Sequence, residues 1–82
     1  MTIKVSKPQN LQALYAKAIK DAAQHNISWT GDMQQGSGSG FGFEGSYVVD
    51  DEHIIIHVRK KPLLVSKSRI EKEVKEYVSQ VD

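Results

Sequence analysis

The chain has 82 residues, a formal net charge of +1 and no cysteine. A length of this order corresponds to one small domain, so residues 1–82 are expected to fold as a single unit. The lack of cysteine excludes disulfide bonds and thiolate zinc sites. No apolar segment approaches the ~20 residues that a membrane-spanning helix requires. We therefore expect a cytoplasmic protein without a membrane span.

The first residues have the alternation of a short strand. Ile3 and Val5 are separated by polar residues, which favours a strand at the edge of a sheet. Ser6 and Gln9 then have the spacing of a helix capping box, and Pro8 is tolerated in a first helical turn. This strand is therefore expected to lead directly into a helix.

Residues 11–22 have the periodicity of an amphipathic helix. Its apolar stripe consists of Leu11, Leu14, Tyr15, Ala18, Ile19 and Ala22. Asn26 follows, and asparagine accepts the left-handed conformation in which many helices end. One face of this helix is expected to pack on a sheet.

The middle third of the chain alternates between apolar and polar residues, which predicts strands. A second strand is expected over residues 27–34, with Trp29 on its inward row as a packing residue or, if exposed, as a stacking platform. Residues 36–40 are typical of a flexible glycine-serine loop. The expected inward row of a third strand is Phe41, Phe43, Gly45, Tyr47 and Val49.

A fourth strand and a second helix complete the pattern. The acidic residues 50–52 are expected to form a turn before the strand, and Pro62 ends the strand because proline cannot donate to a strand ladder. Either Ser68 or Ser66 caps the second helix. The inward row of the strand is Ile54, Ile56 and Val58, and the apolar stripe of the helix is Ile70, Val74, Tyr77, Val78 and Val81.

The predicted element order is βαβββα, a small α+β domain. An antiparallel sheet with one apolar face requires both helices to pack on that face. The opposite face is expected to be polar and solvated, and is the place to search for chemistry. Its expected residues are Ser28, Thr30, Asp32, Glu44, Ser46, His53, His57 and Arg59.

The motifs associated with catalysis or cofactor binding lack their structural context. Residues 40–45 spell G-x-G-x-x-G, but this segment runs into a strand, whereas a dinucleotide site needs a helix there. His53 and His57 lie ~13 Å apart on one strand and do not chelate a single ion together. No serine lies in a nucleophile elbow. We therefore expect no enzyme activity, and no catalytic, cofactor-binding or metal-binding residues.

A basic segment precedes and opens the second helix. Its residues are Arg59, Lys60, Lys61, Lys67 and Arg69. Double-stranded RNA-binding domains have the order αβββα and a basic helix start, so nucleic-acid binding through residues 59–69 is the alternative functional hypothesis. The characteristic sequence marks of that family are missing here.

The chain resembles a family of small polyhydroxyalkanoic acid system proteins, which are encoded beside bacterial polyester-granule genes. The matching positions are Ile3-x-Val5, Lys7-Pro8 before Leu11, Trp29-x-Gly31-Asp32, Gly42 to Gly45, Leu63-Leu64 and Ile70-Glu71. They span nearly the whole chain in the same order. The resemblance implies a bacterial cytoplasmic protein without established catalytic activity that associates with polyester granules.

The residues offer a mechanism for such an association. Leu63, Leu64 and Val65 either close the core beneath the second helix, which is the simpler account, or face an apolar surface with lysines at the rim. The expected partners are thus another protein or an apolar granule surface, with a homodimer through the open edge of the first strand as a further expectation. The candidate binding surface is Arg59, Lys60, Lys61, Leu64, Lys67 and Arg69.

Overall fold

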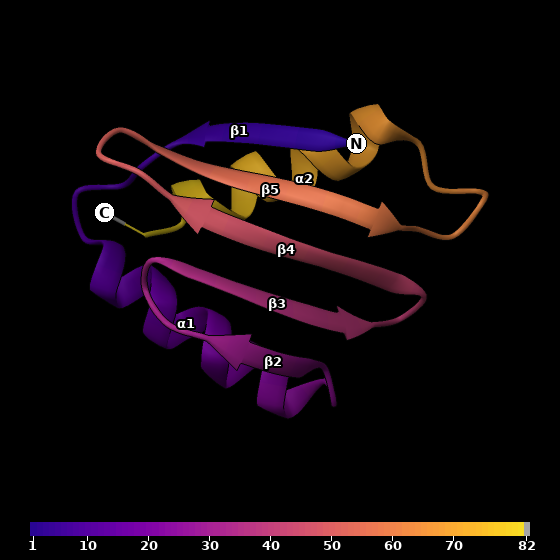
Figure 1. Ribbon diagram of the computed structural model, residues 1–82, viewed down its shortest axis with the longest axis horizontal. Helices are drawn as coiled ribbons and strands as arrows, with labels where there is room; N and C mark the ends of the chain where they lie inside the picture. Colours follow the sequence, from indigo (N-terminus) through magenta and orange to yellow (C-terminus); the bar gives the residue numbers. More distant parts are fainter. Residues whose placement is uncertain (82) are drawn as a thin grey trace.

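The structure is a computed structural model that describes residues 1–81. Within those residues it contains two helices and five strands (Figure 1). In chain order they are β1 (Thr2–Ser6), α1 (Leu11–Gln24), β2 (Ser28–Gly31), β3 (Gln35–Gly40), β4 (Phe43–Val49), β5 (His53–Lys60) and α2 (Lys67–Ser79). The described chain therefore has one more strand than the sequence predicted.

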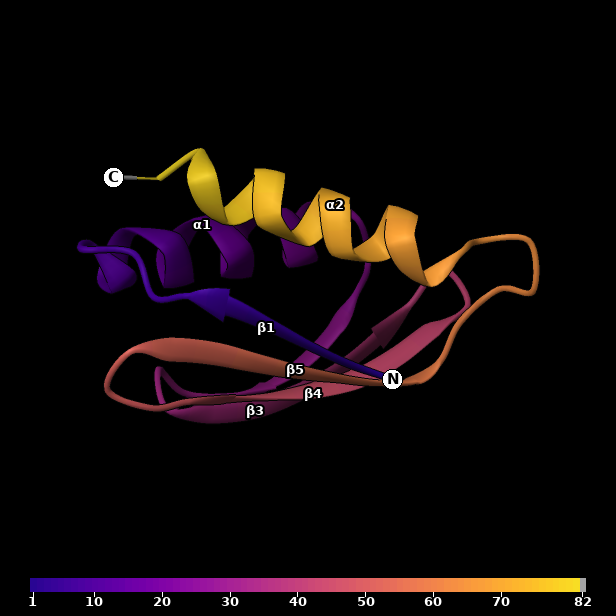
Figure 2. The ribbon, with the colours of Figure 1, turned by 90° about the horizontal axis from the view of Figure 1, so that it is seen from above.

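All five strands form one antiparallel sheet in the order β1-β5-β4-β3-β2. Both helices lie on the same side of that sheet (Figure 2). The predicted α+β class, with two helices packed on one face of an antiparallel sheet, is confirmed. The edge position of β1 is also as predicted, and β2 forms the other edge.

The additional strand is the glycine-serine segment that was predicted to be a loop. Residues 35–40 pair with β2 on one side and with β4 on the other. Glycine is depleted from strands because it has no side chain to pack, although its backbone pairs like any other. The two flanking strands supply that pairing here, so the flexible-loop prediction was wrong.

A turn stabilised by a side chain ends β2 earlier than predicted. The strand expected over residues 27–34 is present only as Ser28–Gly31. The Asp32 carboxylate accepts hydrogen bonds from the backbone N–H groups of Gln34 and Gln35, at 2.8 and 3.0 Å. These bonds lower the pKa of Asp32, because they stabilise its ionised form. Aspartate favours turns for this reason.

Phe41 does not belong to the inward row to which alternation assigned it. Phe41 and Gly42 form the two-residue turn between β3 and β4, with φ values of +53° and +83°. Positive φ at both central positions is the geometry that a tight antiparallel hairpin requires. The Phe41 side chain is consequently 69% exposed, whereas Phe43, Tyr47 and Val49 are half-buried as expected.

The helix ends agree with the sequence in part. Asn10, not Ser6, caps α1, and its side chain accepts a hydrogen bond from the backbone N–H of Ala13 at 3.0 Å. Asn26 has the predicted left-handed conformation after α1, with φ of 57°. Ser66, the alternative start, caps α2 by accepting from the N–H of Arg69 at 3.2 Å.

The tightly packed part of the core lies under β1 and β5. Ile3 and Val5 are 2% and 5% exposed, and Ile54 is 6% exposed. Ile19 is 41% exposed, although helical spacing placed it in the apolar stripe of α1, because it lies at the margin of that stripe. The buried apolar residues are Ile3, Val5, Leu14, Ala22, Ile54 and Ile70.

Candidate ligand cavity and apolar tip

Two of the five cations in the predicted basic surface are paired with neighbouring acids. Arg59 faces Glu44 across the β4–β5 pair with a nitrogen–oxygen distance of 3.9 Å. Arg69 is paired with Glu73 one turn further along α2, at 3.3 Å. Both pairs are exposed and therefore contribute little to stability. They nevertheless remove two of the five expected cations as free phosphate ligands.

The three lysines of this surface have different roles. Lys61 donates a hydrogen bond from Nζ to the backbone carbonyl of Val65 at 2.8 Å, which braces the loop between β5 and α2. Lys60 and Lys67 are exposed, and among residues 1–81 no acidic side chain pairs with either. Two free cations thus remain beside this loop.

Leu63 and Leu64 project fully into solvent. They are 96% and 98% exposed, whereas Val65 is half-buried and packs against the core. The Val65 N–H donates to the Pro62 carbonyl at 3.2 Å, and this turn places its two central residues outward. The expectation that all three residues close the core was therefore wrong for the two leucines and is confirmed only for Val65.

A third exposed apolar side chain lies at the same end of the molecule. The turn that carries Phe41 and the loop that carries the leucines both lie beyond the sheet on the right of Figure 1. The two segments touch, because a methyl group built on Gly42 would meet the Pro62 ring at 3.1 Å. Phe41, Leu63 and Leu64 are hereafter called the apolar tip.

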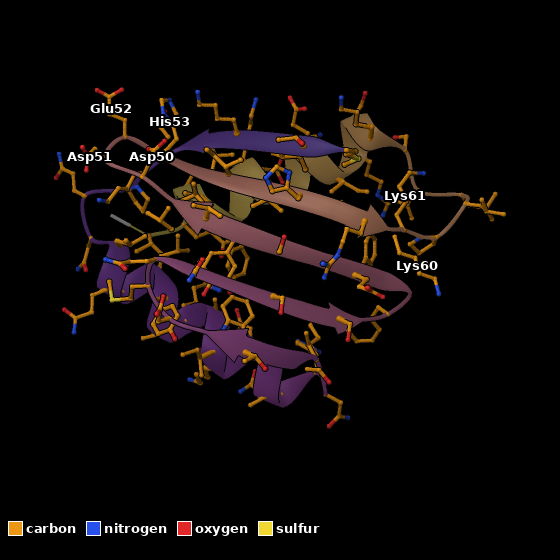
Figure 3. The ribbon with its side chains drawn as sticks, in the orientation of Figure 1. Asp50, Asp51, Glu52, His53, Lys60 and Lys61 are labelled. Carbon is orange, nitrogen blue, oxygen red and sulfur yellow. The ribbon has the colours of Figure 1, made fainter. Side chains whose placement is uncertain are left out.

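The charged groups are distributed along the long axis of the molecule. Lys60 and Lys61 lie at the end of the apolar tip, whereas Asp50, Asp51 and Glu52 lie at the opposite end (Figure 3). The Asp50 carboxylate accepts from the N–H groups of Glu52 and His53, which confirms the predicted acidic turn and lowers the pKa of Asp50. The end with the apolar tip therefore carries Lys60 and Lys61, and the opposite end carries the acidic turn with Lys7 beside it.

A cavity of about 490 Å³ lies between the inner face of the sheet and the two helices. Its walls include Leu14 and Ala18 of α1, Val74 and Tyr77 of α2, and Trp29 and Tyr47 of the sheet. Native cores rarely contain voids larger than a water molecule. A space of this size is instead typical of a site for a small organic ligand.

Glycines on the inner face of β3 make room for the aromatic walls. Trp29 is opposite Gly38, and Tyr47 is opposite Gly36, in the neighbouring strands. A methyl group on Gly36 would lie 2.6 Å from the Tyr47 ring, so a larger residue does not fit there. The Trp29 and Tyr47 rings pack with their centroids 5.2 Å apart.

Polar atoms anchor the outer parts of these aromatic side chains. The Tyr15 hydroxyl donates to the Gly31 carbonyl at 2.9 Å, and the Tyr47 hydroxyl donates to the Asp32 carbonyl. Burial is the main cause that raises the pKa of Tyr47 to about 12. The Tyr47 hydroxyl in the cavity wall therefore stays uncharged over the physiological range.

Tyr77 connects the two helices at the cavity. Its hydroxyl donates to the Asp21 carboxylate at 2.6 Å, and Lys17 reaches the same carboxylate at 2.9 Å. Burial, followed by the bond to Asp21, raises the pKa of Tyr77. The bond from Tyr77 is the largest cause that lowers the pKa of Asp21. This contact fixes the distance between the helices above the sheet.

Trp29 carries an unsatisfied polar atom in the cavity wall. Its indole Nε1 is buried, and no acceptor among residues 1–81 bonds to it. A buried donor without a partner costs about 1–3 kcal/mol. Trp29 was predicted to face the core, which is confirmed, but the cavity beside it was missed. The signal was present in the alternate glycines at 36, 38 and 40 beside the aromatic residues of the flanking strands.

Residues predicted for the polar face, such as Thr30, Ser46 and His57, lie on strands β2, β4 and β5, whereas Asp32 lies in the turn after β2 and not on the strand face. No group of residues that could hold a metal ion is present among residues 1–81. His57 bonds through Nδ1 with the Thr2 hydroxyl at 3.1 Å, and Ser46 lies beside it in register. No family model, curated protein or solved structure matches the chain. None of the described helices combines the length and apolar character needed to cross a membrane.

Proposed function

We propose that the protein is a non-enzymatic cytoplasmic accessory protein that attaches through its apolar tip to an apolar surface bearing negative charge. The observation that carries this proposal is the nearly complete exposure of two adjacent leucines, at 96% and 98%. Soluble proteins seldom expose contiguous large apolar side chains without an interaction partner. Leu63 and Leu64 are braced in this position by the turn from Pro62 and by Lys61.

The energetics favour such an attachment. Burying one leucine side chain contributes about 1.5–3 kcal/mol. A lysine near an anionic surface adds about 1 kcal/mol. Lys60 and Lys67 are free to make this contribution, and the acidic turn points away from the same surface (Figure 3).

The resemblance to polyhydroxyalkanoic acid system proteins suggests the identity of the surface. A polyester granule would offer an apolar surface, and anionic lipid on that surface would supply the negative charge. The apolar tip and its lysines fit both components. We therefore propose the granule surface as the partner, ahead of another protein.

Flotation with coated particles tests the proposal. The protein is mixed with polyhydroxyalkanoate particles coated with phosphatidylglycerol, and the fraction that floats with them is measured. We expect the variant with Leu63→Ser and Leu64→Ser to lose most of this binding. Val48→Thr is the matched control, because Val48 is 45% exposed on β4, away from the tip. Equal binding by both variants would refute the proposal.

Two further measurements separate the alternative hypotheses. Nucleic-acid binding through residues 59–69 predicts salt-dependent binding of duplex RNA that serine substitution of the leucines leaves unchanged. The ion pairs of Arg59 and Arg69 place this hypothesis second. A homodimer through the edge of β1 predicts a doubled mass in light scattering, independent of particles.

A further inference from the structure

We infer that the cavity between the sheet and the helices binds one neutral molecule with a medium-length aliphatic chain. This inference concerns a second site. The cavity is lined by residues of α1, α2 and the sheet, whereas the proposed surface attachment uses the exposed leucines of the loop before α2.

Size and lining define an organic ligand. Sites for small ligands have volumes of ~300–1,000 Å³ and mostly apolar walls. The cavity of about 490 Å³ lies within this range, and aliphatic side chains such as Leu14, Ile56 and Val74 contribute to its walls. An aliphatic chain is complementary to such a lining, whereas water makes too few hydrogen bonds there to be held strongly.

The charges around the cavity select a neutral ligand. Among the residues that line it, Glu73 is the one acid, and no lysine, arginine or histidine is present. Glu73 already has a cation in Arg69, at 3.3 Å. A ligand carboxylate would therefore be transferred from water without a counter-ion, which is strongly unfavourable. The ester of the same acid does not carry that penalty.

Trp29 places an aromatic ring in the cavity wall, where it can report on a bound ligand. Its Nε1 has no acceptor among residues 1–81, and the ring forms part of the cavity wall. The Nε1 atom itself is covered by protein, so a ligand in the cavity is expected to contact other parts of the ring.

Phe41 connects the cavity to the outside. It lines the cavity and is at the same time 69% exposed in the turn between β3 and β4. Its ring packs edge-on against His25 with the centroids 6.2 Å apart. A ligand is therefore expected to enter beside this ring.

The test uses Trp29 as a reporter, because it is the single tryptophan of the chain. Methyl octanoate is titrated into the labelled protein at neutral pH while the indole N–H resonance and tryptophan fluorescence are recorded. Octanoate and octane are the comparison probes. We expect saturable binding of the ester and of octane, and binding at least about tenfold weaker for the carboxylate.

Matched variants on α1 locate the binding. Ala18→Phe projects into the cavity and should abolish the ester response, whereas Ala16→Phe lies on the exposed side of the same helix and should retain it. If circular dichroism shows that the Ala18→Phe variant is unfolded, the Ala18→Leu variant is used in its place. An ester response that persists in the Ala18 variant would overturn the inference. Octanoate binding that is as tight as binding of its ester would also overturn it.

The leucine variant distinguishes the two sites. With Leu63→Ser and Leu64→Ser, the ester should still bind even though particle binding is lost. Ester binding that disappears in this variant but survives Ala18→Phe would place the ligand on the apolar tip and refute the cavity site. Particle binding without ester binding would refute only the cavity site.

Discussion

The two halves of the sheet fill their inner faces in opposite ways. Under β1 and β5, branched side chains such as Ile3 and Ile54 are 2% and 6% exposed. On β3 the corresponding inward positions are glycines, and a cavity of about 490 Å³ lies above that part of the sheet. Backbone pairing is continuous across both halves. Hydrogen bonds therefore maintain the sheet throughout, while side-chain volume decides where the domain is packed and where it is open.

This contrast predicts that stability and binding reside in different halves. The packed half supplies most of the buried apolar area, which is the dominant favourable term in folding. The glycine-rich half contributes less to stability and holds the space for a ligand. Substitutions that exchange these properties test the comparison directly.

The largest effect is expected from opening the packed half. Ile3→Ala should reduce the free energy of unfolding by about 2–5 kcal/mol, because it leaves a void at the most buried side chain. Urea denaturation measures the loss. Ile19→Ala, at the margin of the apolar stripe of α1, is the control and should cost far less, because Ile19 is 41% exposed. Equal losses would contradict the assignment of the core to β1 and β5.

A smaller loss is expected from adding volume to the glycine-rich half. Gly36→Ala places a methyl group 2.6 Å from the Tyr47 ring and should cost about 1–3 kcal/mol. Displacement of the ring into water should also lower the Tyr47 pKa from about 12, as followed by tyrosinate absorbance. Ser37→Ala, on the other face of β3, should change neither quantity.

The contact between the helices is expected to act through pH. Because the folded-state pKa of Asp21 lies below its ordinary value of 3.8, its stabilisation is present above that pH and is lost as pH falls through the folded pKa. Tyr77→Phe removes the largest cause of this shift. The variant should therefore show a higher Asp21 pKa in a carboxyl NMR titration and a smaller loss of stability in acid. An unchanged pKa would contradict the role of the Tyr77 hydroxyl.

The smallest effect on stability is expected at the apolar tip. Replacing Leu63 and Leu64 with serine should alter the free energy of unfolding by no more than about 0.5 kcal/mol per site, as is usual for surface residues. Val65→Ser, in contrast, should destabilise the domain clearly, because Val65 packs against the core. Thermal unfolding of the three variants measures the difference.

Periodicity predicted the elements that carry large apolar side chains. The helix over residues 11–24 and the strand over residues 53–60 have such patterns, and both are present. β3 was missed because glycine has low strand propensity, and its pairing depends on strands that are remote from the local pattern. Phe41 was misplaced because the alternation continued through a turn whose positive φ values interrupt the strand.

The candidate sites were less predictable than the fold. The segment containing Leu63 and Leu64 was recognised, but exposure depends on whether the turn from Pro62 directs them inward or outward. The ion pairs of Arg59 and Arg69 depend on neighbours across the sheet and along α2. A cavity forms where the sheet and the helices enclose more volume than their side chains fill. The spacing of residues along one strand determines neither of these two volumes.

The pairing of β1 has a consequence for how the chain folds. β2, β3, β4 and β5 each pair with the next strand along the chain, so this meander can assemble by successive closure of short hairpins. β1 instead joins β5 across more than fifty residues, from Thr2 opposite His57 to Ser6 opposite His53. Because β1 carries Ile3 and Val5 into the core, its late docking should be the step that commits the chain to its native state.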